Sequence, residues 1–179
     1  MKVGTEGAYS PFTFHDPKDN ALTGYDVEVV QAVAKELGVT AEFSETPFDA
    51  IFAGLEAKRF DVVANQVSIT EERSAKYAFS TPYTVSTGVV VTRTDDASVR
   101  ALADLRGKTS AQSVTSSFAK TATAAGARIE AVEGFTQAIG LLKQGRVDVT
   151  LNDGPTPGGW HCSGRRAGWC SRDTTCSRT

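Results

Sequence analysis

The stretch DVVANQVSITEERSAKYAFSTPY, residues 61–83, is the part of the sequence that most narrows the choice of fold. Asp61–Ala64 is a short apolar run of the kind that a parallel sheet buries on both faces. Amide and hydroxyl side chains follow at residues 65–70, and charged residues follow them. The stretch therefore predicts a buried strand, a polar turn, a short helix and a return strand that ends at Pro82-Tyr83.

Arg73 lies in the first turn of that predicted helix, an unusual place for a cation. Thr70 or Ser68 can cap the helix, and Ser68-x-x-Glu71 has the spacing of a capping box. The N-terminal end of a helix dipole is already positive, so an arginine there is explained best by a bound anion. The carboxylate of a free amino acid is such an anion. The alternative is a solvated arginine beside its acidic neighbours.

The first half of the chain alternates strands and helices. The apolar pattern predicts the following elements: a strand at Val3–Thr5, a helix capped by Asp26 with Val29, Val30, Val33 and Leu37 on one face, a stop at Gly38, a strand through Val39, Ala41 and Phe43, and a helix that begins at Asp49. Strands alternating with helices imply parallel pairing through right-handed crossovers. Ligands of such sheets collect at the carboxyl ends of the strands.

A second α/β set follows the long extended run at Gly88–Thr92, which we expect to carry the chain from one lobe to another. The predicted elements are a short helix at residues 101–105, a strand at 108–111, a helix from about Ser116, a strand at 129–132, a helix at 135–143 and a strand at 147–151.

Four motifs in this order and spacing resemble a known family: GTEGAYSPF at Gly4–Phe12, LTGYDV at Leu22–Val27, SITEER at Ser68–Arg73 and FSTPY at Phe79–Tyr83. They are similar to the polar amino-acid-binding proteins of bacterial ABC importers. The resemblance covers roughly residues 2–153 and implies an α/β fold with two lobes, the periplasmic-binding-protein or Venus flytrap type. It implies lobe 1 at residues 1–90 and an incomplete lobe 2 at 91–153, without the family's return crossing.

Residues 154–179 differ from the rest. No Val, Ile, Leu, Met, Phe or Tyr follows Leu151, whereas all three cysteines lie there. We expect a foreign or disordered tail without a strand, because so little apolar area cannot offset the entropy of ordering. A metal site of His161, Cys162, Cys170 and Cys176 is the alternative, but the spacing fits no zinc finger, so no metal is predicted. An incomplete lobe 2 would favour self-association of an otherwise monomeric protein.

The resemblance implies a site for the two charged groups of an amino acid. Arg73 would hold the carboxylate, with Ser68 and the Thr70 backbone N–H beside it. Asp153, after Asn152, would accept the ammonium group, which has donors only. The alternative for Asp153 is a turn or capping residue.

A second anion site is expected in the loop between a strand and a helix at residues 112–117, whose N–H groups would face the cleft, with Gln112, Thr115 and Ser116 as ligand contacts. The family usually has glycine before this threonine, whereas Val114 stands here, so the turn must use ordinary dihedral angles. The alternative is a plain N-cap loop.

Aromatic and polar side chains are expected to line lobe 1. These are Glu6, Tyr9 and Phe48, and the aromatic rings would sandwich an apolar or sulfur-containing side chain of the ligand. Core packing is the alternative for Tyr9 and Phe48, and it is the expected role of Phe12. Asn65 and Gln66 resemble the cystine-binding branch of the family. Amides and hydroxyls with few charges suit a neutral polar ligand better than lysine or arginine.

The resemblance implies an extracytoplasmic amino-acid-binding protein, with L-cystine as the expected ligand. Such a protein delivers its ligand to a membrane permease by lobe closure. The net charge of −2 does not indicate the positively charged surface that nucleic-acid binding requires. No apolar run could span a bilayer, and Met1-Lys2 leads into the first strand without a visible signal peptide. No catalytic motif, metal site or cofactor is expected. The alternatives are a cyclohexadienyl or arogenate dehydratase-like enzyme, a receptor's sensor module and a binding-defective fragment.

Overall fold

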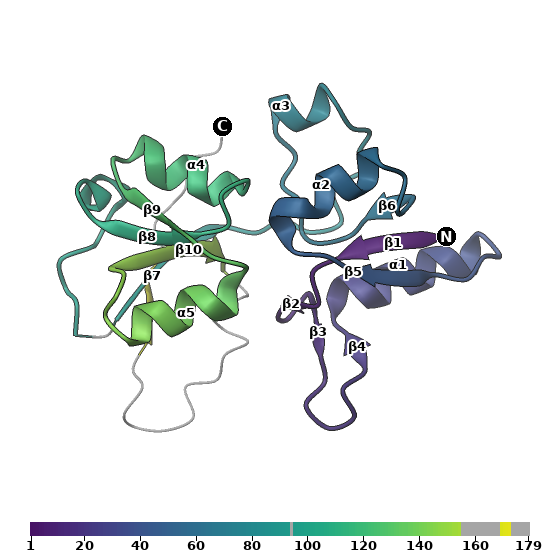
Figure 1. The fold of residues 1–179 in the computed structure, drawn as a ribbon, viewed down its shortest axis with the longest axis horizontal. Helices are drawn as coiled ribbons and strands as arrows, with labels where there is room; N and C mark the ends of the chain where they lie inside the picture. Colours follow the sequence, from purple (N-terminus) through teal and green to yellow (C-terminus); the bar gives the residue numbers. More distant parts are fainter. Residues whose placement is uncertain (94, 155–168, 173–179) are drawn as a thin grey trace.

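The computed structural model describes residues 1–93, 95–154 and 169–172, which form two α/β lobes side by side (Figure 1). Lobe 1 has a parallel sheet of β1 (Lys2–Thr5), β5 (Glu42–Glu45) and β6 (Val62–Val63) in the order β5-β1-β6. Because β1 is central, the two crossovers run in opposite directions. Right-handed connections then place α1 (Tyr25–Glu36) and α2 (Phe48–Glu56) on opposite faces of the sheet.

A second, antiparallel sheet in lobe 1 was not predicted from the sequence. It contains β2 (Ala8–Tyr9), β3 (Thr13–His15) and β4 (Leu22–Thr23). Strands of two or three residues carry too few side chains for a period-2 pattern to be visible. This small sheet places Tyr9 and Phe12 at the border with lobe 2.

Lobe 2 has a five-stranded sheet in the order β11-β7-β10-β8-β9. Its strands are β7 (Gly88–Arg93), β8 (Thr109–Gln112), β9 (Arg128–Ala131), β10 (Val149–Asp153) and β11 (Trp169–Arg172). Its helices are the 3-10 turn η1 (Leu102–Leu105), α4 (Ser117–Ala124) and α5 (Phe135–Lys143). β8 runs parallel to β9 and β10, whereas β7 is antiparallel to β10. The predicted α/β fold with two lobes is confirmed.

The expectation that no strand lies beyond residue 154 is wrong for residues 169–172. β11 pairs antiparallel with β7, with Trp169 opposite Arg93 and Arg172 opposite Val90. Pairing to a sheet edge uses backbone N–H and C=O groups, which every sequence offers, so it does not need an apolar pattern. The expected disorder of the tail otherwise concerns residues 155–168 and 173–179, which lie outside the described part of the chain.

Several details of lobe 1 differ from the predictions. Helix α1 buries Val27, Val30 and Ala34, whereas Val33 is 49% exposed and Leu37 is 64% exposed. The predicted and the observed buried faces of α1 both have helical spacing, so the apolar pattern alone could not distinguish between them. Strand β5 begins at Glu42, later than expected.

The predicted caps are also corrected in part. Gly24, not Asp26, is the N-cap of α1, and the Asp26 carboxylate instead accepts hydrogen bonds from Gln66. Thr70 caps the short helix α3 (Glu71–Ser74) by accepting from the Arg73 N–H, so Ser68 forms no capping box. No return strand forms at residues 78–83.

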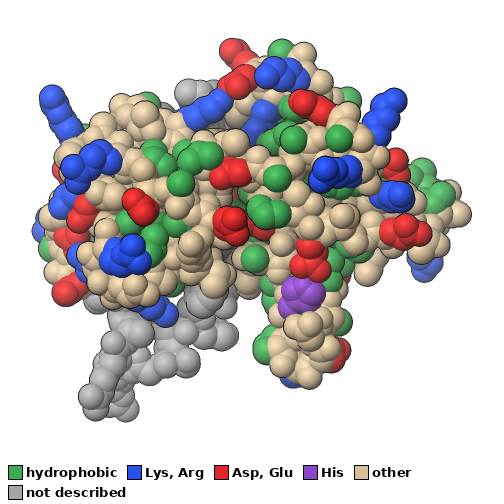
Figure 2. Space-filling view, in the orientation of Figure 1, with side chains coloured by type: hydrophobic (Ala, Val, Ile, Leu, Met, Phe, Trp, Pro, Cys, Tyr) green, Lys and Arg blue, Asp and Glu red, His purple; other side chains and the backbone are tan. Residues whose placement is uncertain are grey.

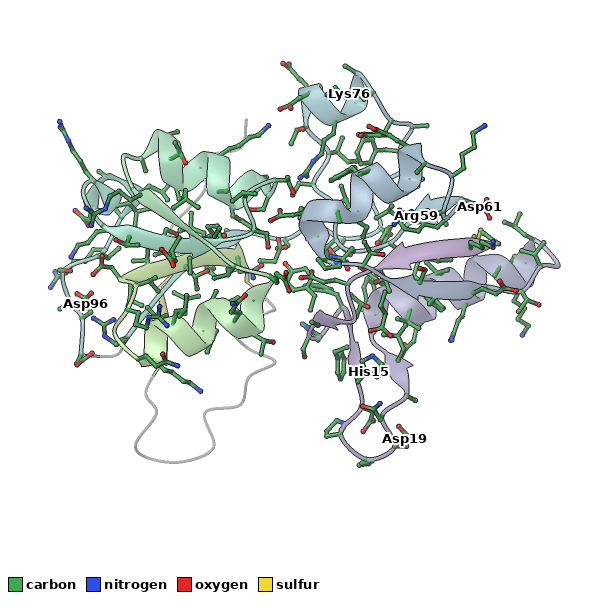
Figure 3. All side chains as sticks on the ribbon, viewed as in Figure 1. His15, Asp19, Arg59, Asp61, Lys76 and Asp96 are labelled. Carbon is green, nitrogen blue, oxygen red and sulfur yellow. The ribbon has the colours of Figure 1, made fainter. Side chains whose placement is uncertain are left out.

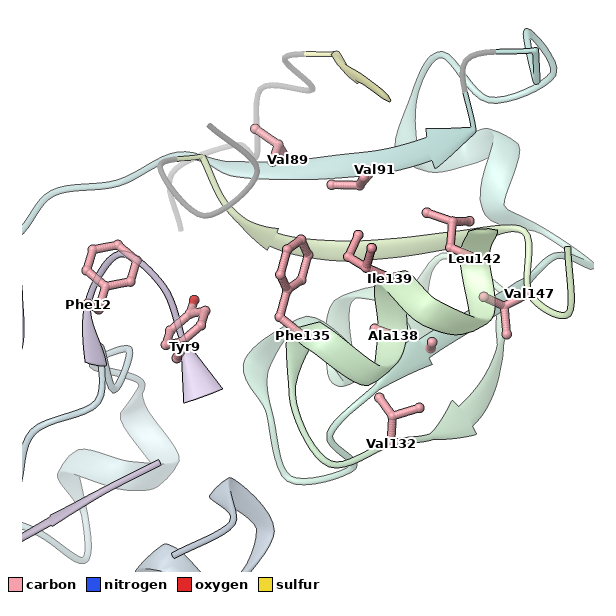
Figure 4. Packing of buried hydrophobic residues seen from close by; sticks show 11 residues of the cluster. Tyr9, Phe12, Val89, Val91, Val132, Phe135, Ala138, Ile139, Leu142 and Val147 are labelled. Atoms are coloured by element: carbon pink, nitrogen blue, oxygen red, sulfur yellow. The ribbon is translucent and has the colours of Figure 1, made fainter. Parts of the chain in front are cut away.

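One apolar cluster joins the two lobes. Tyr9 and Phe12 of lobe 1 belong to the same buried cluster as Phe135, Ile139 and neighbouring side chains of lobe 2 (Figure 4). Phe12 is 3% exposed, which confirms the predicted core role. The two lobes therefore share a packed border, and the polar site described below lies next to it.

Candidate ligand-binding site

A cleft of about 530 Å³, its open mouth included, lies between the lobes. It is lined by these residues predicted from the sequence: Glu6, Tyr9, Phe48, Asn65, Gln66, Ser68, Arg73, Gln112, Ser116 and Asp153. Thr70 and Thr115 do not belong to its lining. Figure 2 shows acidic side chains in the middle of the molecule, where the two lobes meet. The structure thus gathers most of the candidate residues around one space.

Arg73 is the principal cation of the cleft. Its guanidinium donates to the backbone oxygen of Ser68 at 3.0 Å and to that of Thr115, in lobe 2, at 3.1 Å. It also lies over the rings of Phe48 and Phe52, 5.7 and 5.1 Å from their centroids. Burial lowers the pKa of Arg73 below its usual value. Within the described part of the chain it forms no salt bridge, so the positive charge has no carboxylate partner.

The residues expected beside Arg73 have partners of their own. Ser68 shares a hydrogen bond of 3.1 Å with Ser117 across the cleft. The Thr70 hydroxyl is occupied as the cap of α3. Phe48 stands edge-on to Phe52 and forms part of the wall under the guanidinium. Its ring therefore serves both the wall of the cleft and the packing of α2.

Glu6 is held by Asn65 through two hydrogen bonds. The Asn65 Oδ1 accepts from the Glu6 backbone N–H at 2.8 Å, and the Asn65 Nδ2 donates to Glu6 Oε2 at 3.2 Å. Burial raises the pKa of Glu6, and the nearby charge of Asp49 raises it further, whereas the bond from Asn65 lowers it. Asn65 is only 2% exposed, so it positions Glu6 more than it offers free groups of its own.

Asp153 ends β10 and receives two hydroxyl contacts. Ser86 Oγ donates to its Oδ1 at 2.6 Å, and Tyr9 Oη lies 2.7 Å from its Oδ2. Tyr9 Oη also lies 2.5 Å from Asn152 Oδ1, so its single proton serves two acceptors. Tyr9 therefore combines the two roles considered for it, since the ring packs in the core while the hydroxyl reaches the polar site.

The expected anion site in lobe 2 is filled by the protein itself. Asp49, near the start of α2, accepts from the Val114 N–H at 3.1 Å and from the Thr115 N–H and hydroxyl at 3.0 and 2.7 Å. Ser116 caps α4 by accepting from the Ala119 N–H. Gln112 donates to two hydroxyls inside lobe 2, those of Ser110 and Thr150. The turn thus joins the lobes through a carboxylate of lobe 1.

Other residues of the lining were not predicted. They are Ala111, Ser113, Ser117, Phe118, Val132, Gly134, Phe135, Ala138, Thr150 and Asn152. Ser113 and Ser117 lie in the loop at residues 112–117 that was expected to form the anion site, although they were not named as ligand contacts. Gly134 comes so close to Glu6 Oε1 that a Cβ there would collide with it. A close approach between two segments so far apart in the sequence could not be predicted from local sequence patterns.

The described residues contain no group of three or more His, Cys, Asp or Glu side chains arranged to hold a metal ion. The metal alternative of the tail concerns side chains outside the described part. None of the described helices is long and apolar enough to cross a membrane.

The sequence matches the bacterial extracellular solute-binding proteins, family 3, over residues 1–132. It is 57% identical over 153 residues to the L-cystine-binding protein TcyA of Bacillus subtilis, covering 86% of this chain and 57% of that protein. It is 56% identical over 153 residues to a probable amino-acid ABC transporter-binding protein of Haemophilus influenzae, covering 86% and 59%. The chain thus spans less than two thirds of the length of these relatives.

Solved structures of amino-acid-binding proteins have the same fold. An ancestral arginine-binding protein bound to glutamine superposes with a TM-score of 0.90 at 33% identity, covering 98% of this chain and 78% of that one. The ancestral amino acid-binding protein AncCDT-1, described as a precursor of cyclohexadienyl dehydratase, gives 0.87 at 30%, covering 98% and 77%. Together with the match over residues 1–132, these likenesses show that the chain belongs to family 3 of the bacterial extracellular solute-binding proteins.

Proposed function

We propose that this chain binds an amino acid between its lobes and presents it to the membrane permease of an ABC importer, with L-cystine as the favoured ligand. The observation that carries the proposal is the half-buried Arg73. Its guanidinium contacts backbone oxygens of both lobes, lines the cleft and lacks a carboxylate partner among the described residues. A planar guanidinium matches a carboxylate geometrically, and a ligand's α-carboxylate would supply the missing negative charge.

The second charge of the amino acid has a matching group. Asp153 lines the same cleft, and its two oxygens are oriented by Ser86 and Tyr9. A carboxylate offers acceptors only, which complements the three donors of an ammonium group. Arg73 belongs to lobe 1 and Asp153 to lobe 2, so a bound amino acid would connect the lobes and favour their closure.

The assignment to L-cystine is supported by the names of relatives. TcyA of Bacillus subtilis and TcyJ of Escherichia coli are both named L-cystine-binding proteins, and TcyJ is 46% identical over 110 residues. The proteins of family 3 are extracellular solute-binding proteins, which supports a place outside the cytoplasm for this chain. A role without catalysis fits these names, so a dehydratase activity is not favoured even though AncCDT-1 has the same fold.

Isothermal titration with L-cystine under non-reducing conditions, followed by a panel of other amino acids, tests the proposal. We expect one-to-one binding of L-cystine that is tighter than that of arginine, lysine or glutamate. A turnover assay on prephenate and arogenate in parallel should show no product. Absence of binding to every amino acid of the panel would contradict the proposal, and turnover would favour the enzyme.

A further inference from the structure

Asp153 lies at the place where the chain crosses from lobe 1 into lobe 2. It is the last residue of β10 and stands opposite Gly88, the first residue of β7. The Gly154 N–H donates to the Thr87 backbone oxygen at 2.9 Å. In the described part of the chain, residues 84–87 are the only covalent connection between the lobes (Figure 1). The backbone of Asp153 is therefore fixed to the lobe 2 end of this connection.

The connection has an exposed residue between two anchored ones. On the side of lobe 1, Thr84 Oγ1 accepts from Gln66 Nε2 at 3.2 Å. On the side of lobe 2, Ser86 Oγ donates to Asp153 Oδ1 at 2.6 Å. Val85 lies between them and is 95% exposed. A rotation of the lobes about Val85 keeps Ser86 and Asp153 together, so the hydroxyl holds the carboxylate in the open and the closed arrangement.

Ser86 is the hydroxyl donor that serves Asp153 alone among the described residues. Tyr9 Oη lies 2.7 Å from Asp153 Oδ2 but also 2.5 Å from Asn152 Oδ1, and it has a single proton. Tyr9 also belongs to lobe 1, so its contact with Asp153 requires that the lobes be together. The Ser86 bond, at 2.6 Å, has the length of a charge-assisted bond from a hydroxyl to a carboxylate.

Ser86 acts on the cleft only through Asp153. Asp153 lines the cleft, whereas Ser86 does not. A carboxylate has about four acceptor positions, so Asp153 can receive the Ser86 and Tyr9 hydroxyls and still accept from a ligand. The Ser86 bond fixes the direction in which the remaining acceptor positions point. Interactions of this kind, behind the group that touches the ligand, determine how precisely that group is placed.

The direction of the Asp153 carboxylate matters for the stereochemistry of the ligand. With its carboxylate at Arg73 and its side chain in the cleft, an L-amino acid and its D enantiomer differ in where the ammonium group and the hydrogen on Cα lie. A carboxylate held in one direction therefore receives the ammonium group of one enantiomer better than that of the other.

We propose that Ser86 is a positioning residue that gives the cleft its preference for the L enantiomer of its amino acid. It holds the Asp153 carboxylate from the connection between the lobes, before and after they close. The inference rests on the proposed function, because Asp153 must take the α-ammonium group of the ligand for its direction to matter.

Titration calorimetry with L-cystine and D-cystine, under non-reducing conditions, tests the inference. The two enantiomers are identical in charge, size and solvation, so the ratio of their affinities reports the geometry of the site. A general loss of stability or of closure would weaken both enantiomers alike and leave this ratio unchanged. The wild-type protein should bind L-cystine about tenfold more tightly or better.

Ser86→Val removes the hydroxyl, and Ser86→Thr keeps it at nearly the same side-chain volume as valine. Ser86→Val should reduce the preference to about threefold or less, whereas Ser86→Thr should retain it. Ser86→Ala should behave like Ser86→Val, which keeps the test valid if the larger side chain prevents folding. Ser98→Val is the matched control, because Ser98 Oγ donates to Asp96 Oδ1 at 2.5 Å in lobe 2, far from the cleft (Figure 3). Its preference should equal that of the wild type.

An unchanged preference in folded Ser86→Val or Ser86→Ala, with L-cystine still bound, would overturn the inference and leave the proposed function intact. Equal affinities of the wild type for L-cystine and D-cystine would also overturn the inference alone. Absence of binding to both enantiomers and to every other amino acid of the panel would overturn the proposed function, and the inference with it.

Discussion

Arg73 is the residue on which affinity should depend most. We expect Arg73→Ala to weaken amino-acid binding about 30-fold or more, because a charged contact in a closed cleft contributes roughly 2–5 kcal/mol when its partner would otherwise be stranded. Titration calorimetry checks the prediction. Arg59→Ala, an exposed arginine of lobe 1 away from the cleft (Figure 3), should bind like the wild type. A folded Arg73→Ala protein within threefold of wild type would contradict the carboxylate role.

Glu6 should make stability depend on pH. Its pKa is raised in the folded protein, chiefly by burial, so the folded state holds the Glu6 proton more tightly than the unfolded chain. Its contribution to the free energy of unfolding is therefore most favourable below pH 4.5 and declines as the pH rises through the raised pKa.

Glu6→Gln removes this dependence, so the variant should gain stability relative to wild type between about pH 4 and pH 7.5. Urea denaturation at both pH values measures the difference. Glu36→Gln, on the exposed side of α1, is the control and should run parallel to wild type. A Glu6→Gln protein whose difference from wild type is the same at both pH values would contradict the prediction.

At the scale of elements, Asp49 joins α2 to the turn before α4. It accepts from the Val114 and Thr115 N–H groups and from the Thr115 hydroxyl, in the other lobe. The contact exists only while the lobes are together, so it stabilises the closed arrangement. Asp49 itself does not line the cleft.

Asp49→Asn should therefore weaken amino-acid binding about threefold to tenfold, mainly by faster dissociation, because the contact is exposed and worth roughly 1 kcal/mol. Surface plasmon resonance with an immobilised protein checks the rate. Asp61→Asn serves as the control, because Asp61 accepts from the Lys2 backbone N–H in lobe 1 and lies far from the cleft (Figure 3). Tighter binding by Asp49→Asn would show that the turn is better used by the ligand's own carboxylate, as the sequence suggested.

Two glycines make room for the Phe60 ring between β1 and α2. The Phe60 ring lies where Gly4 and Gly54 leave room, and a Cβ at either glycine would come within 2.5 or 2.6 Å of it. Gly4→Ala should lower the free energy of unfolding by roughly 1–3 kcal/mol through overpacking.

Gly140→Ala is the matched control, because nothing lies within 4 Å of a Cβ at this position in α5. It should raise the free energy of unfolding by about 0.5–1 kcal/mol through helix propensity. Chemical denaturation measures both variants. Equal effects of the two substitutions would mean that Phe60 moves aside at little cost.

For the whole molecule, a ligand that bridges the lobes should raise the melting temperature. At a concentration of 100 Kd the stabilisation is about 2.7 kcal/mol, which corresponds to a rise of roughly 5 °C or more. L-cystine should raise the melting temperature more than arginine, lysine or glutamate at equal concentration, and differential scanning fluorimetry measures it. A larger rise with arginine would contradict the cystine assignment but not the fold.

The sequence by itself determined the order of the main elements. Predicted helices and strands appear at α2, α5, β1, β7 and β8 within a residue or two, because apolar periodicity reports which side chains a helix or strand must bury. Its motifs also indicated the family by resemblance, and that resemblance pointed to Arg73 and Asp153, which both line the cleft together with Glu6. These residues belong to short motifs of neighbouring residues, which can be recognised from the sequence alone.

Only the tertiary structure decided how the polar groups are shared. Asp49 occupies the turn that was expected to hold an anion, and Asp26 holds Gln66 from 40 positions away. The expectation that no strand forms in the tail was wrong for a related reason. β11 pairs with the edge of β7, where Trp169 lies opposite Arg93, 76 positions earlier in the chain. Hydrogen bonds between distant segments depend on which groups folding brings together, and local sequence patterns do not encode that proximity.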